Sequence, residues 1–139
     1  MAFIQQNDLE RYIDPEDLNQ IIQEDSCIVT GAISDSIEFG KEKLRQRYDV
    51  DFEYLQTGTE RKRQLLKQTI AVCLYFICER LPTDILPENR TISFDHACDW
   101  FKQCASGMIM PDLKTLDDES QIGLSIRYGN SSIKRNNNY

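Results

Sequence analysis

An uninterrupted apolar run at residues 70–78 constrains the fold more than any other feature of this sequence. The run lies inside a pattern that predicts a helix over residues 59–81, which Pro82 ends. A helix that is apolar on every side has to be buried on every side. In a chain of 139 residues, this burial requires either a central place in the fold or a neighbouring subunit. In the second case, we expect inter-subunit packing at Val72, Leu74, Tyr75 and Phe76.

Helical patterns also precede this run. A short helix is expected over residues 8–13, and the pair Asp14 and Pro15 is a strong start signal for a second helix, because Asp caps helices and Pro suits their first position. Residues 27–48 carry an apolar stripe at helical spacing. Gly40 lies on that stripe and weakens the helix, so a close helix crossing is expected there.

The second half of the chain completes an all-α fold. A loop is predicted over residues 49–58 and a last helix over residues 93–107, with Gly107 suited to the left-handed position that ends a helix. Residues 1–110 are therefore predicted to form a small all-α bundle of about four main helices. Residues 111–139 are predicted to form a long extended C-terminal tail, because they contain too few apolar residues to build a core.

Part of this tail has the pattern of a short strand. Apolar residues alternate with small or polar ones over residues 122–128. Such a segment can add to the edge of a partner's sheet, and the charged residues that follow it are all basic. The residues predicted to bind a partner are Ile122, Leu124, Ile126, Arg127, Tyr128, Lys134 and Arg135.

Charge is distributed unevenly along the chain. Lys and Arg number 16 and Asp and Glu 23, so the net charge is −7. Residues 1–25 contain seven acids and one base, whereas residues 41–80 contain nine bases and six acids. This asymmetry favours complementary head-to-tail contacts between copies, although a solvated surface accounts for any single patch. A chain this acidic is poorly suited to gripping DNA.

Catalytic, cofactor and metal chemistry leave little trace in the sequence. The single histidine, His96, begins the last predicted helix, and Cys98 is two residues away and points elsewhere, so no Cys–His pair is expected. The five cysteines fit a protein that matures in a reducing compartment. The four that fall in predicted helices do not have the spacing of a zinc site and are predicted to be small buried apolar residues: Cys73, Cys78, Cys98 and Cys104. The chain is not expected to be an enzyme or to hold a cofactor. The cluster at residues 60–63 is predicted to be solvated.

Four stretches of the chain resemble the Mu-type phage family of short helical head-to-tail connector (head-completion) proteins. The first stretch is Asp8-Leu9, at the start of a small helix. The second lies in the helix predicted over residues 27–48 and runs from Gly31-Ala32-Ile33 to Arg47-Tyr48. The third is the order of Leu65-Leu66, Ile70-Ala71, Leu74-Tyr75 and Arg80. The fourth is His96-Ala97-Cys98-Asp99-Trp100-Phe101-Lys102 with Ala105-Ser106-Gly107. The resemblance covers roughly residues 8–113.

This resemblance implies a structural adaptor that forms a dodecameric ring beneath the portal, in the neck of a virion assembled in the host cytoplasm. DNA would pass through the ring without sequence-specific binding. The expected partners are the portal protein, tail or further neck proteins, and copies of the same chain. No contact with a membrane is expected. The alternative is a small helical regulatory or partner-binding module, since the same helices and tail permit it.

Overall fold

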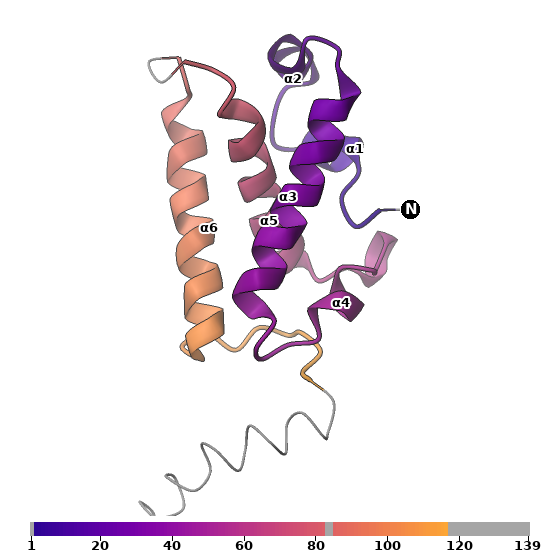
Figure 1. The fold of residues 1–139 in the computed structure, drawn as a ribbon, viewed down its shortest axis with the longest axis vertical. Helices are drawn as coiled ribbons and strands as arrows, with labels where there is room; N and C mark the ends of the chain where they lie inside the picture. The colour runs from indigo at the N-terminus through magenta and orange to yellow at the C-terminus, as the bar shows by residue number, and fades with distance from the viewer. Residues whose placement is uncertain (1, 83–84, 117–139) are drawn as a thin grey trace, which may run out of the picture.

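The computed structural model describes residues 2–82 and 85–116. Its elements are α1 (Gln6–Leu9), α2 (Pro15–Ile22), α3 (Ser26–Leu44), α4 (Val50–Glu53), the 3-10 turn η1 (Gly58–Glu60), α5 (Arg63–Cys78) and α6 (Glu88–Ser106). The three long helices alternate in direction, and α5 packs on both α3 and α6, which also contact each other (Figure 1). No sheet occurs among the described residues, where one isolated antiparallel bridge joins Tyr48 to Thr115. The all-α prediction is confirmed.

The apolar helix α5 is buried by the chain itself. Val72 and Leu74 are 0% exposed, so a central place in the bundle buries them without a neighbouring subunit. The sequence pattern predicted a subunit contact at these residues because it left their burial unexplained, and the fold of the single chain now explains that burial. Tyr75 and Phe76 are half-buried, and Tyr75 stacks on Phe94 of α6 with 4.1 Å between ring centroids.

Two predicted boundaries around residues 49–60 are wrong. The predicted loop contains α4, because the carboxylate of Asp49 accepts a hydrogen bond from the Phe52 amide and caps this short helix. The helix predicted from residue 59 begins instead at Arg63, since η1 comes first and Arg61 has an extended backbone. The last helix, α6, begins at Glu88, earlier than predicted.

A close helix crossing was expected to compensate for Gly40, but a tyrosine side chain occupies the space beside this glycine. The ring of Tyr54, which follows α4, covers Gly40, and a Cβ atom built there would lie 2.9 Å from Tyr54 Cζ. The Tyr54 hydroxyl lies 3.0 Å from Thr69 Oγ1 of α5. Thr69 donates its one proton to the Leu65 carbonyl, so Tyr54 must be the donor in the bond between them. Gly40 therefore creates the space that lets α4 dock on the bundle.

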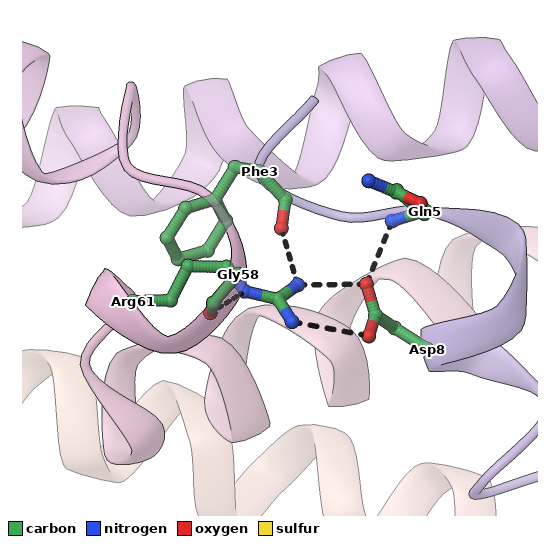
Figure 2. A network of polar contacts seen from close by, with 5 residues as sticks. All are labelled: Phe3, Gln5, Asp8, Gly58 and Arg61. Carbon is green, nitrogen blue, oxygen red and sulfur yellow. Dashed lines mark hydrogen bonds and ion pairs between the residues drawn. The ribbon is translucent and has the colours of Figure 1, made fainter. Parts of the chain in front are cut away.

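Arg61 ties the N-terminal segment to the turn before α5 (Figure 2). Its Nη1 donates to Asp8 Oδ2 at 2.7 Å and to the Phe3 carbonyl at 2.8 Å, while its Nε donates to the Gly58 carbonyl at 2.9 Å. Burial acts to raise the pKa of Asp8, but hydrogen bonds from Arg61 and from the Gln5 amide outweigh it and lower that pKa. The prediction that this basic cluster is solvated is therefore wrong for Arg61, whose side chain is 13% exposed.

Candidate functional site

The chain just beyond α6 is held on the body by the loop and short helix that follow α3. The Asp49 amide donates to the Lys114 carbonyl at 2.8 Å, and the Lys114 amide donates to Glu53 Oε2 at 2.6 Å. Leu113, just before, is 9% exposed and joins the hydrophobic core. We call this region the C-terminal anchor; its residues are Tyr48, Asp49, Glu53, Leu113, Lys114 and Thr115.

Local sequence explains why residues 48–54 can bind a second segment of the chain. Val50 and Tyr54 are buried, so the turn between them is pulled against the bundle and Glu53 points inward. The Asp49 cap at the start of α4 leaves its own backbone amide free to bond across to Lys114. The Lys114 ammonium adds two contacts, at 3.6 Å from Asp49 Oδ2 and 4.3 Å from the centre of the Phe52 ring.

Glu53 is the most unusual group in the C-terminal anchor. The residue is 1% exposed, and its Oε1 has no hydrogen-bond partner among the described residues. A buried carboxylate is costly unless it is well bonded, so its retention here depends on the short bond to Lys114. Glu53 therefore links the stability of α4 to the docking of residues 113–115.

A second set of contacts sets the path of the chain as it leaves α6. Gly107 has the left-handed backbone, with φ +86°, that was predicted for it and ends the helix. Arg47 donates from Nε to the Ala105 carbonyl at 2.8 Å, which satisfies one of the free carbonyls at the helix end. These contacts turn the chain under the bundle toward α4 (Figure 1).

Exposed apolar side chains occur on the chain segments that flank the C-terminal anchor. Phe52 and Leu55 lie in and just after α4 and are 43% and 78% exposed, and Met108 and Met110 follow α6 and are 76% and 87% exposed. Four of the seven large exposed apolar side chains in the described part of the chain thus belong to the end of the bundle where residue 116 leaves it (Figure 1). We call these four residues the apolar end.

The predicted site residues fall into two groups. The partner-binding residues Ile122, Leu124, Ile126, Arg127, Tyr128, Lys134 and Arg135 lie outside the described residues. The two residues considered for catalysis are on α6, where His96 is exposed and Cys98 is half-buried. Burial raises the pKa of the Cys98 thiol, which makes it a poorer nucleophile.

No family model, curated protein or solved structure matches the chain. Within residues 2–82 and 85–116, no three His, Cys, Asp or Glu side chains are grouped in a way that could hold a metal ion. No helix in this part of the chain is long and apolar enough to cross a membrane.

Proposed function

We propose that the chain is a structural head-to-tail connector of a tailed bacteriophage, a subunit of a dodecameric ring beneath the portal in the virion neck. The observation that carries this proposal is the C-terminal anchor. Such a subunit needs a rigid body that presents one end of its chain to a neighbour from a defined point. Asp49, Glu53 and Lys114 define that point by a backbone hydrogen bond of 2.8 Å and a bond of 2.6 Å from the Lys114 amide to the Glu53 carboxylate.

The surface around this point supports the same role. The apolar end would be covered by a partner in an assembled neck, because burying large apolar side chains is the main favourable term in protein association. The acids of the second helix and its cap, Asp14, Glu16 and Asp17, are exposed and available for contacts with a basic neighbour. In a ring these contacts are heterologous, since two different faces of each copy meet.

The bundle also supports stepwise assembly. Its central helix is buried without help from a second copy, with Val72, Leu74 and Ile77 all 0% exposed. A subunit of this kind is folded before it reaches the portal. Contacts in the ring are then made by surface residues and by the C-terminal segment, and not by the core. DNA would then pass through the ring without sequence-specific contacts.

Deleting the gene from the phage that encodes it tests the proposal. We expect DNA-filled heads and free tails that do not join, and recovery of joined particles when the full chain is supplied in trans. Normal numbers of joined, infectious particles without the gene would overturn the proposal. Capture of one host protein together with absence from virions would favour the regulatory-module alternative.

A surface variant locates the contact. Met110→Gln changes the apolar end, and Ile85→Gln is its matched control, because Ile85 is 60% exposed in the connection between α5 and α6 at the opposite end of the bundle. Both variants should unfold at the wild-type urea concentration. Only Met110→Gln should lower the fraction of protein that co-sediments with portal rings. Equal effects of the two variants would remove the apolar end from the proposed interface.

A further inference from the structure

A pocket of about 210 Å³ lies between α5 and α6, on a part of the surface that shares no residue with the C-terminal anchor. Its apolar lining includes Ile70 and Leu74 of α5, which are 2% and 0% exposed. Tyr12, from the segment between α1 and α2, closes one side. The chain thus builds this pocket from three separate stretches of sequence.

Three basic side chains line the pocket. Lys67 comes from α5, and Arg90 and His96 come from α6. No acidic residue lines the pocket, although the chain as a whole carries a net charge of −7. Among the described residues, none of the five ion pairs includes any of these three side chains. The charges of Lys67 and Arg90 are therefore available to a ligand.

Arg90 is held in place in this pocket. Its Nη2 donates to the backbone carbonyl of Tyr12, which orients the planar guanidinium and leaves donors on its other nitrogens. Ser93 lies one helical turn further along α6 on the same face and also lines the pocket. A fixed guanidinium beside a hydroxyl group suits an acceptor with two oxygens.

We propose that this pocket binds a carboxylate carried on a short aliphatic stem. The volume lies below the roughly 300–1,000 Å³ of pockets for drug-sized ligands, so the ligand group has few atoms. The carboxylate would meet Arg90 and Lys67, and the stem would lie against Tyr12 and Ala71, the apolar lining residues that solvent reaches. Inorganic phosphate satisfies the basic groups but leaves these two residues uncovered. The carboxylate comes either from an acidic side chain of a protein partner or from a free small acid.

The test is an amide chemical-shift titration of the full-length protein with four probes. These probes are glutarate, a capped Gly-Glu-Gly peptide, the capped Gly-Gln-Gly peptide and inorganic phosphate. We expect saturable shifts in residues 67–74 and 90–96 with glutarate, with the Glu peptide or with both, and weaker binding as salt is added. Binding of glutarate alone identifies a free acid as the ligand, and binding of the peptide identifies a partner's side chain.

Two matched variants separate a built pocket from general attraction to a basic surface. Lys67→Gln removes a pocket charge, whereas Lys102→Gln removes an exposed charge of α6 that does not line the pocket. We expect Lys67→Gln to weaken binding about threefold and Lys102→Gln to leave it unchanged. The proposal is overturned if the Gln peptide or phosphate binds as tightly, if no probe saturates, or if both variants lose equally. These outcomes do not depend on whether the chain is a phage connector.

Discussion

Replacing Gly40 by alanine is expected to destabilise the protein, although alanine is normally the better helix former. The new Cβ would lie 2.9 Å from Tyr54 Cζ, closer still to the hydroxyl oxygen, and 3.4 Å from Cε1 of Phe101. Tyr54 has little freedom to move aside, because it is 5% exposed and bonded to Thr69. Its ring also packs edge-on against Phe3, with 4.8 Å between ring centroids.

Three terms set the size of the effect. Forcing a methyl group into a filled core costs about 1–3 kcal/mol. Displacing Tyr54 breaks its hydrogen bond to Thr69, which contributes about 1 kcal/mol. The better helix propensity of alanine offsets about 1 kcal/mol of this loss. The expected net fall in the free energy of unfolding is about 2 kcal/mol.

Urea unfolding followed by far-UV circular dichroism measures this difference. Gly31→Ala is the matched control in the same helix, since Gly31 is exposed and nothing lies within 4 Å of its Cβ position. We expect Gly31→Ala to raise stability by up to about 1 kcal/mol and Gly40→Ala to lower the urea midpoint by about 1 M. Adding Tyr54→Phe to Gly40→Ala should recover part of the loss. A Gly40→Ala protein as stable as the Gly31→Ala protein would refute the reasoning.

Three further predictions concern the other contacts. Glu53→Ala leaves the Lys114 amide without its acceptor, so hydrogen exchange should accelerate at that amide and not in α5; unchanged exchange would contradict the C-terminal anchor. Asp8→Asn removes one partner of a buried ion pair and should lower the free energy of unfolding above pH 4. Because the pKa of Asp8 is lowered in the folded state, this difference should vanish as the pH falls through that pKa, and a pH-independent loss would contradict it. A thiol reagent should label exposed Cys27 in the folded protein but not Cys73, since burial raises the pKa of Cys73 to about 12; equal labelling rates would contradict this burial.

Features encoded by neighbouring residues could be predicted from the sequence. Asp14 caps α2 as expected, accepting a hydrogen bond from the Glu16 amide at 2.9 Å, and Gly107 ends α6 with a left-handed backbone. The apolar run at residues 70–78 correctly predicted a helix that is buried nearly all round. In each case the interaction spans only a few residues, so the local pattern contains the necessary information.

Features that depend on distant parts of the chain could not be predicted. Arg61 bonds to Asp8, 53 positions away, and Glu53 bonds to Lys114, 61 positions away. Neither arginine nor glutamate is expected in the interior until its partner is known. Ser36 is 0% exposed, and its hydroxyl is satisfied by a hydrogen bond to the Ile33 carbonyl. The buried face of α3 therefore includes a polar residue that the apolar stripe omits.

The C-terminal anchor could not be predicted for the same reason. The pattern around residues 49–54 combines acids with aromatic residues and predicts a loop. The Asp49 cap was the one local signal that could have revealed α4. Nothing near Glu53 in the sequence indicates that its partner is the chain that follows α6. Only the fold brings residues 48–54 and residues 113–115 together to form the candidate site.

Quantitative mass spectrometry of purified virions tests the proposed function most directly. In particles of the phage that encodes the chain, the account predicts as many copies of this chain as of the portal protein. It also predicts that cross-links join residues near the C-terminal anchor to the portal or to a second copy. Complete particles that contain the portal and lack this chain would contradict the account.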